Sequence, residues 1–279
     1  MSLVHCKSQV IVLGDIGRSP RMQNHALSLA DDGWQVELIG YDDSAPRLTV
    51  QNHPSITIRA LPTPWKLPRS PKLLYVLLII PAAVTRALSL FWALTAGGLK
   101  GVFLVQNPPS IPTLLVARLA ATFWHGAALA VDWHNYGYTI METTGAPGLT
   151  IQVAKFYEKL VGPWADIHFC VAKSMRADLA AHWGIPGALV LYDKAPTSFG
   201  PTPPEVAQAL HTRLEEAGAT TRSEFYDGEG RLRADRPALV VSSTSWTPDE
   251  DFSMFLDALI ALDQALPATA GKRMQAWTA

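Results

Sequence analysis

The stretch Val10-Ile-Val-Leu-Gly-Asp-Ile-Gly-Arg-Ser-Pro20 decides the fold class. Its first four residues form the short apolar run that is typical of a buried strand. A glycine turn follows, and then an expected helix over residues 20–32, which Ser19 can cap at its start and Gly33 can end. Pro20 at the first helical position supports that boundary. A strand, a turn and a helix in this order predict the first unit of a parallel α/β sheet.

The same alternation of apolar runs and helical stretches continues to about residue 191. The expected strands are 9–13, 35–39, 56–60, 102–106, 129–133, 167–171 and 188–191. The expected helices after the first are 71–95, 111–124, 149–161 and 173–183. Because strands and helices alternate, residues 1–195 are expected to form a complete Rossmann-like α/β domain.

The character of the chain changes after that domain. Prolines open residues 196–236 and a mixed charge run closes them, which is typical of a linker with at most one short helix. Residues 237–246 then begin again as an apolar strand, and a capping box precedes an apolar helix over 252–266. Residues 237–279 are therefore expected to be the first βα unit of a second Rossmann-like domain. One unit cannot form a sheet alone, so this end of the chain is expected to be truncated.

Composition excludes several classes of partner. Lys and Arg number 23 against 24 Asp and Glu, a net charge of −1, whereas proteins that track nucleic acid carry a clear basic excess. The two cysteines, Cys6 and Cys170, form no Cys-x-x-Cys pair, and no Cys/His cluster has the spacing of metal ligands. The sequence therefore predicts no nucleic acid partner, no disulfide framework, no bound metal and no cofactor.

The distribution of charge is more informative than its total. Residues 44–131 contain eight basic side chains and no Asp or Glu. An acid-free basic segment suits an anionic membrane surface or a phosphate-bearing ligand, although a solvated basic helix face has the same composition. Within it, residues 73–98 are the most apolar stretch, but Pro81 and Arg86 divide it into runs too short to span a bilayer. We favour a helix that lies on or slightly in a bilayer, with a buried helix and a true span as alternatives.

Two groups of residues are candidates for binding phosphate. Gly14, Gly17 and Arg18 occupy the turn ahead of the first helix, where free N–H groups, the helix dipole and a permanent positive charge favour an anion. Their spacing is neither that of a dinucleotide-binding motif nor that of a P-loop, and a solvated tight turn is the alternative. Ser243 and Thr244 precede the second-domain helix and are suited to hold a diphosphate.

Candidate catalytic and acceptor residues follow the fourth and fifth strands. Ligands of doubly wound folds sit at the carboxyl ends of strands, which is where Asp132-Trp-His-Asn-Tyr-Gly-Tyr138 lies. Asp132 and His134 are suited to be a general base and its orienting partner, with a structural histidine beside a capping aspartate as the alternative. The residues expected to contact a sugar acceptor are Asn107, Asn135, Tyr136 and Glu158, of which Glu158 is as well explained by a solvated helix face.

Six motifs occur together and in order along the chain. They are Leu13-Gly-Asp-Ile-Gly-Arg-Ser-Pro-Arg-Met-Gln23, Gln106-Asn-Pro-Pro109, Asp132 to Tyr138, Tyr157-Glu-Lys159, Tyr192-Asp-Lys194 and Ser242-Ser-Thr-Ser-Trp246. Together they closely resemble the chitobiosyldiphosphodolichol β-mannosyltransferase family from about residue 10 to residue 266. The resemblance implies a GT-B-type glycosyltransferase in which two Rossmann-like domains face each other across a cleft, with no metal required.

The resemblance also implies a reaction. Such an enzyme transfers the first mannose from GDP-mannose to GlcNAc2-diphosphodolichol, in β-1,4 linkage, on the cytosolic face of the endoplasmic reticulum membrane. Making a β-mannoside from an α-linked donor implies one inverting displacement, which needs a base on the acceptor hydroxyl and a stabilised leaving diphosphate. The implied partners are GDP-mannose, dolichol-diphosphate-chitobiose, the membrane surface and other mannosyltransferases that build the same lipid-linked oligosaccharide for N-glycosylation.

This chain departs from the family pattern in two places. Family members usually begin with a membrane-spanning anchor, and they continue well beyond residue 266 into a region that holds most donor contacts. Two alternatives to an active enzyme of this family therefore remain. One is a catalytically inactive, truncated remnant that stays on the membrane and binds acceptor lipid or partner transferases. The other is a related mannosyltransferase that acts later on the same lipid.

Overall fold

The structure is a computed structural model that describes residues 6–63, 72–96, 101–123, 127–195, 199–218, 222–236 and 251–265. The chain divides into two compact units, Met1–Pro196 and Thr197–Ala279. Ser243 and Thr244, and the strand expected over residues 237–246, lie outside the described residues.

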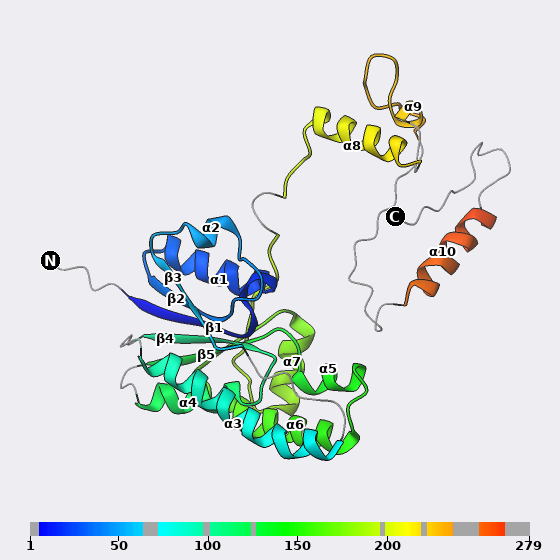
Figure 1. Cartoon of the computed structure of the whole chain (residues 1–279). Coiled ribbons are helices and arrows are strands. Elements are labelled where there is room, and N and C mark those ends of the chain that lie inside the picture. The colour runs from blue at the N-terminus through cyan, green and yellow to red at the C-terminus, as the bar shows by residue number, and fades with distance from the viewer. Residues whose placement is uncertain are drawn as a thin grey trace. The chain divides into compact units, whose positions relative to one another are not determined.

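The first unit is built on one sheet of seven parallel strands (Figure 1). In chain order they are β1 (Lys7–Asp15), β2 (Gln35–Tyr41), β3 (Ile56–Ala60), β4 (Val102–Asn107), β5 (Ala128–Trp133), β6 (Ile167–Cys170) and β7 (Leu189–Val190). Their order in space is β3-β2-β1-β4-β5-β6-β7, so the direction of winding reverses between β1 and β4. All seven predicted strands are present, which confirms the α/β sheet.

Helices cover both faces of this sheet (Figure 1). On one face lie α1 (Pro20–Asp31) and α2 (Leu48–Gln51), and on the other lie α3 (Lys72–Ala96), α4 (Thr113–Phe123) and α6 (Gly148–Val161). Two shorter helices, α5 (Gly137–Thr143) and α7 (Lys173–His182), complete the unit. The five predicted helices of this unit agree with α1, α3, α4, α6 and α7 to within two residues at each end. The sequence did not predict α2 or α5.

The side chains of β1, an interior strand, alternate between the two faces of the sheet, and both faces are covered by hydrophobic core. Val10 and Val12 belong to the apolar cluster that includes Met22 of α1, while Ile11 and Leu13 belong to the cluster that includes Leu90 of α3. Successive side chains of a strand point to opposite faces, so a strand covered on both sides is apolar at nearly every position. This is why the run 10–13 reads as uninterrupted apolar sequence.

The start of α1 differs in detail from its prediction. Ser19 does stand at the N-cap position, but its hydroxyl makes no capping bond and instead donates to the Gln106 side-chain oxygen at 2.7 Å. This bond joins the turn after β1 to the end of β4, where the winding reverses. The end of α1 agrees with its prediction, because Gly33 has a φ of +89°, a conformation that favours glycine.

Helix α3 runs without a break through Pro81. Leu90 and Leu94 are fully buried in the core, whereas Val84, Leu88 and Trp92 are exposed. The helix therefore covers the sheet with one face and shows apolar side chains to solvent with another. Its inner face agrees with the buried alternative, and its location on a bilayer stays a prediction. In the part of the chain that the structure describes, no helix has both the length and the apolarity needed to cross a membrane.

The second unit contains α8 (Pro204–Glu216), α9 (Arg222–Phe225) and α10 (Phe252–Ala265) among its described residues. The His211 ring of α8 packs against Phe225, with 4.5 Å between ring centroids, and against Tyr226 at 5.2 Å. The segment expected to be a linker therefore folds into a small helical hairpin. Helix α10 agrees with the apolar helix predicted over residues 252–266.

Replacing Phe103 tests whether the two-faced sheet supplies the stability of the first unit. Phe103 of β4 is 1% exposed and lies in the cluster beneath α3 and α4. We expect Phe103→Ala to lower the free energy of unfolding by about 3–5 kcal/mol, because the substitution leaves a cavity in packed core. Urea unfolding monitored by tryptophan fluorescence measures the change. The exposed control Val84→Ala should change it little, and an equal effect of both variants would contradict this account.

Candidate active site

The site is built from the loops at the carboxyl edge of the sheet. Ligands of doubly wound folds bind there, at the point where the strand order reverses, which here lies between β1 and β4. The turn after β1, the residues after β5 and the segment after β7 all reach this edge. They carry the side chains that the motifs singled out.

The turn after β1 has a shape that only glycine permits. The carboxylate of Asp15 accepts hydrogen bonds from the backbone N–H groups of Gly17 and Ser44, both at 3.1 Å. A Cβ on Gly17 would lie 2.3 Å from the Ser44 carbonyl oxygen, so no side chain fits there. The Ser44 side chain, and after it the backbone N–H groups of Ser44 and Gly17, lower the pKa of Asp15, which favours the charged form of this carboxylate.

Two of the three residues predicted to bind phosphate near α1 lie in the turn after β1, and the third lies in β1 itself. Gly17 and Arg18 stand in the short 3-10 helix Ile16–Arg18 directly ahead of α1. The Arg18 side chain is 83% exposed and lies 3.5 Å from the Asp15 carboxylate, so its charge is available to a ligand. Gly14 instead lies inside β1, which runs one residue further, to Asp15. The prediction that Gly14 belongs to the phosphate turn is therefore wrong.

A buried ionic cluster stands where the sequence predicted a free general base. Asp132 of β5 is fully buried, and its two carboxylate oxygens accept from Arg21 at 2.6 and 2.7 Å. His25, one turn further along α1, lies 2.9 Å from the same carboxylate. The bidentate geometry is the strongest form of an arginine–carboxylate pair. Asp132 therefore ties α1 to the centre of the sheet and has no exposed surface with which to reach a substrate.

The pKa of Asp132 argues against a role as base in the same way. Burial alone would raise this pKa, but the hydrogen bonds and charges of His25 and Arg21 outweigh burial and hold it below its usual value. A carboxylate with a lowered pKa is a weak proton acceptor near neutral pH. The assignment of Asp132 as catalytic base is corrected to a structural anchor.

His134 has the exposure that Asp132 lacks. Its side chain is 39% exposed, and its Nδ1 atom is buried with no hydrogen-bond partner in the described part of the chain. The carboxylate near it is that of Asp193, with Nδ1 3.9 Å from Oδ2. The expected pairing of His134 with Asp132 is therefore wrong, because the two side chains leave the end of β5 toward different partners.

Arg21 links the buried cluster to this exposed pair. Its Nη1 donates to Asp193 Oδ1 at 2.9 Å while its other nitrogens hold Asp132. Asp193 follows β7 and is 57% exposed, so one of its oxygens is fixed by Arg21 and the other faces His134. An imidazole whose second nitrogen faces a fixed carboxylate is oriented for proton transfer.

Two of the expected acceptor residues are buried structural groups instead. Glu158 of α6 accepts from the Asn107 amide at 3.2 Å, from the Ser110 hydroxyl and from the backbone N–H of Gly137 at 2.8 Å. Both Asn107 and Glu158 are 0% exposed. The expectation that they contact a sugar is therefore corrected. They hold the ends of β4 and β5 and the start of α5 together, and Glu158 is not on a solvated helix face.

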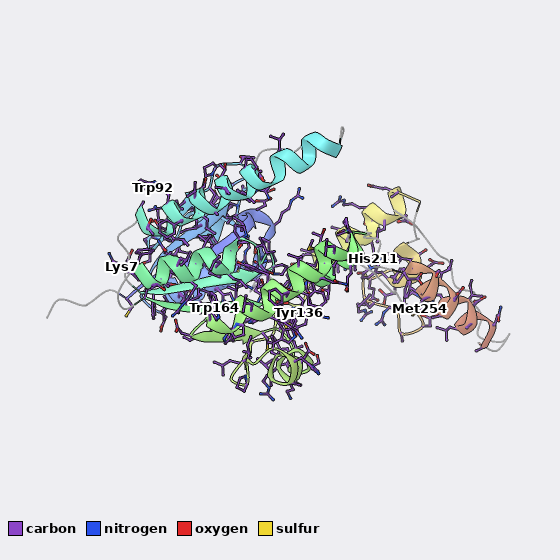
Figure 2. The ribbon with its side chains drawn as sticks, turned by 90° about the horizontal axis from the view of Figure 1, so that it is seen from below. Lys7, Trp92, Tyr136, Trp164, His211 and Met254 are labelled. Carbon is purple, nitrogen blue, oxygen red and sulfur yellow. The ribbon has the colours of Figure 1, made fainter. Side chains whose placement is uncertain are left out.

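The remaining expected acceptor residues stand at the surface of the same edge. Asn135 is exposed, with its backbone bonded to Asn107. Tyr136 stacks on Trp183 with 4.7 Å between ring centroids and donates its hydroxyl proton to Asp178 at 2.6 Å. Burial and the bond to Asp178 raise the pKa of Tyr136, so its hydroxyl stays protonated and occupied. Figure 2 labels Tyr136 among the side chains that surround α5 and α6.

A groove opens beside the turn, between α3 and the ends of β1, β2 and β3. Its walls are mostly apolar, with Leu13, Tyr41, Leu61 and Ala82 among them. Arg86 also lines it, and the Nε atom of Arg86 is buried without a hydrogen-bond partner in the described residues. The small groove thus places one guanidinium beside an apolar wall, a combination suited to an amphipathic molecule with an anionic headgroup.

Sequence reasoning missed Arg21, His25 and Asp193 as parts of the site. Arg21 and His25 are four residues apart on α1, which places them on one face of that helix. A basic pair at this spacing directly after a glycine turn at the switch point was a readable signal. Asp193 stood inside the quoted motif Tyr192-Asp-Lys194, but nothing in the sequence said which groups it faces.

The comparisons with known proteins agree with this architecture. Residues 17–192 match the glycosyl transferase 4-like domain. The chain belongs to the glycosyl transferase 4-like family. A solved structure, sucrose-phosphate synthase from Thermosynechococcus elongatus, superposes with a TM-score of 0.50 at 15% identity over 74% of this chain and 52% of that one. This likeness and the seven-stranded parallel sheet confirm the α/β, GT-B-type fold class.

Curated relatives of this glycosyl transferase 4-like chain include several whose names match the resemblance. It is 38% identical over 93% of its length to the UDP-glycosyltransferase TURAN of Arabidopsis thaliana, of which it covers 60%. It is 38% identical to the chitobiosyldiphosphodolichol beta-mannosyltransferase of Mus musculus and 34% identical to that of Dictyostelium discoideum, over 91% of this chain and 56% of each relative. The resemblance read from the motifs is confirmed. The chain spans rather more than half the length of these relatives.

Replacing Asp132 tests the buried cluster. At pH 7 we expect Asp132→Asn to lower the free energy of unfolding by about 3–5 kcal/mol, because Arg21 loses its buried bidentate partner and keeps only the exposed carboxylate of Asp193. The folded pKa of Asp132 lies below its unfolded value, so its stabilising contribution is complete above the unfolded pKa and is lost as the pH falls through the folded one.

The difference in the free energy of unfolding between wild type and Asp132→Asn should therefore become smaller as the pH falls below the usual pKa range of aspartate. Urea unfolding at neutral pH and at several acid pH values measures this gap. The exposed carboxylate Asp42 supplies the control Asp42→Asn. A gap for Asp132→Asn that stays constant with pH would show that the carboxylate is not held in its charged form.

Replacing Glu158 tests whether it organises the loop before α5. We expect Glu158→Gln to cost about 1–3 kcal/mol of stability, because an amide cannot accept all the bonds that this buried carboxylate accepts. Amide hydrogen exchange at Gly137 and Tyr138 should become faster in the variant. Exchange at these two amides as slow as in wild type would contradict the assigned role.

Proposed function

We propose that this chain provides the acceptor side of a β-mannosyltransferase that moves mannose from GDP-mannose to GlcNAc2-diphosphodolichol in β-1,4 linkage. The observation that carries the proposal is the half-exposed His134, with its buried Nδ1 facing Asp193, at the carboxyl edge of a glycosyl transferase 4-like sheet. The printed names of the relatives from mouse and Dictyostelium supply the substrate class.

The reaction is a single displacement with inversion. The acceptor hydroxyl oxygen attacks the anomeric carbon of mannose while the bond from that carbon to the GDP phosphate oxygen breaks. His134 Nε2 takes the hydroxyl proton, and Asp193 accepts the hydrogen bond from Nδ1–H of the imidazolium that forms. The 3.9 Å separation is that of a ligand-free site, in which such bonds are often long. Arg21 keeps Asp193 in place by bonding to its other oxygen.

Charge on the departing and acceptor diphosphates needs cations. Gly17 and Arg18 present a backbone turn and an exposed guanidinium ahead of α1, which suits one diphosphate. Arg86, beside a small apolar groove, offers a further cation for the diphosphate of the lipid acceptor. No metal is needed for this scheme, since these groups supply the positive charge.

The lipid acceptor decides where the reaction takes place. A dolichol-linked sugar is confined to a bilayer, so we propose that the chain works at the cytosolic face of the endoplasmic reticulum membrane. Other mannosyltransferases that extend the same lipid are its proposed neighbours there.

The direct test is transfer by the 279-residue chain. Incubation with radiolabelled GDP-mannose and detergent-dispersed chitobiosyl-diphospho-lipid should give a lipid-soluble product that β-mannosidase cleaves. Retention of the lipid acceptor without product would instead support the alternative function of a membrane-associated acceptor-binding protein. If the chain neither forms the product nor retains the lipid acceptor, both functions are refuted.

In an active preparation, substitutions of His134 and Asp193 should lower the rate of transfer more than substitutions of other ionisable groups. We expect His134→Gln to lower the rate of transfer by about 100-fold or more, with binding of the acceptor little changed, because a general base contributes on this scale. Asp193→Asn should lower the rate less and shift its pH profile. His53, which stands ahead of β3 at the amino edge of the sheet and pairs with Asp31, supplies the control His53→Gln. Turnover by His134→Gln near the wild-type rate would show that His134 is not the general base.

A further inference from the structure

The face of the first unit formed by α3, α4 and α6 is apolar where it meets solvent. The three helices lie side by side on one side of the sheet (Figure 1). Phe91 of α3 packs edge-on against Phe123 of α4 at 5.8 Å, and the Leu115 N–H of α4 donates to the Tyr157 hydroxyl of α6 at 3.1 Å. We call the solvent side of these three helices the helix face. Figure 2 views the chain from this side and labels Trp92 on α3 and Trp164 just beyond α6.

Helix α6 carries an exposed stripe that no core position requires. Leu149, Val153, Phe156 and Leu160 recur at helical spacing and are all exposed. The opposite side of the same helix holds buried Ala154, Glu158 and Val161. A surface helix ordinarily turns polar groups toward water, so a second apolar stripe marks a contact with something other than water.

The neighbouring helices continue the stripe. Leu88 and Trp92 of α3 are four residues apart and exposed, with Trp92 at 73%, and Leu119 and Phe123 of α4 have the same spacing. Large apolar and aromatic side chains from three adjacent helices thus meet at one surface. Scattered exposed leucines need no explanation, but a continuous group of this kind does.

The charges on these helices have one sign at the surface. Helices α3 and α4 contain no Asp or Glu, and the one acid of α6, Glu158, is fully buried. Their described basic side chains are those of Arg86, Arg118, Lys155 and Lys159. The ammonium groups of Lys155 and Lys159 lie over the rings of Tyr138 and Trp183, beside the stripe of α6. Acids of neighbouring segments also reach this border, since Asp166 pairs with Arg118 and Glu142 lies near the Tyr138 ring. The two lysines beside the apolar stripe of α6 are the groups that complement an anionic lipid surface.

We propose that the helix face docks on an anionic lipid bilayer, with Trp92, Phe156 and their neighbours inserted at the level of the headgroups. The proposal rests on the proposed function, because a lipid-linked acceptor must be met at a membrane. It goes further by naming the surface. Since α6 holds the loop before α5 through Glu158 on its inner side, docking its outer side would also bring that loop close to the membrane.

Vesicle flotation tests the docking surface directly. The probe is vesicles of three parts phosphatidylcholine to one part phosphatidylserine, with pure phosphatidylcholine as comparison. The chain should float with the mixed vesicles, and added salt should weaken this association. The double variant W92S/F156S should bind at least about fivefold less, because insertion of apolar area is lost. The control Leu48→Ser removes an equally exposed side chain (71%) from α2, on the other face of the sheet, and should bind as wild type does.

Three results would overturn the assignment. They are failure of wild type to float with the mixed vesicles, equal binding by W92S/F156S, and an equal loss in Leu48→Ser. Light scattering tests whether a second copy of the chain occupies this face instead. If wild type is a dimer and W92S/F156S is a monomer, the face belongs to a dimer interface. Transfer to a detergent-dispersed acceptor should be unaffected by W92S/F156S, so the docking face and the proposed reaction can fail separately.

Discussion

The bidentate bond between Arg21 and the buried carboxylate of Asp132 is the constraint on which the rest of the site depends. It joins the first turn of α1 to the end of β5, two elements 111 residues apart in the chain. Either group buried without the other would be costly. The pair therefore fixes α1 against the sheet and, through the third bond of Arg21, fixes Asp193 as well. The residues that can do chemistry are positioned by residues that cannot.

Glu158 has the same relation to the other half of the site. It accepts bonds from the end of β4, from the loop after it and from the start of α5, and it has no exposed surface. Burial of this carboxylate is compensated by several donors rather than by one cation. The loop that carries His134 and Asn135 is held at both its ends, by Asp132 before it and by Glu158 after it. A proton acceptor at this position can keep its orientation without being buried itself.

The strands and long helices were predictable because their signals are local. A strand buried on both faces carries a near-continuous apolar run, as residues 10–13 do. The partners of charged residues were not predictable, since His134 and Asp193 are brought together only when β5 and β7 take their places in one sheet. The same limit explains Glu158, because helical periodicity alone could not separate a solvated carboxylate from one with four donors around it. The motifs marked the right edge of the sheet, and the fold decided which motif residues face outward.

The acid-free segment of the sequence shows how folding changes the meaning of a charge count. Arg59 pairs with Glu37 and Arg118 pairs with Asp166, so acids from outside the segment neutralise part of its basic excess. Arg47 is occupied by the side-chain oxygens of Gln23 and Asn24. The positive border of the helix face therefore depends less on the segment that suggested it than on Lys155 and Lys159 of α6, which lie outside it. Apolar exposure and free charge coincide on α6, and this coincidence, rather than the composition of residues 44–131, is what singles out one face of the sheet.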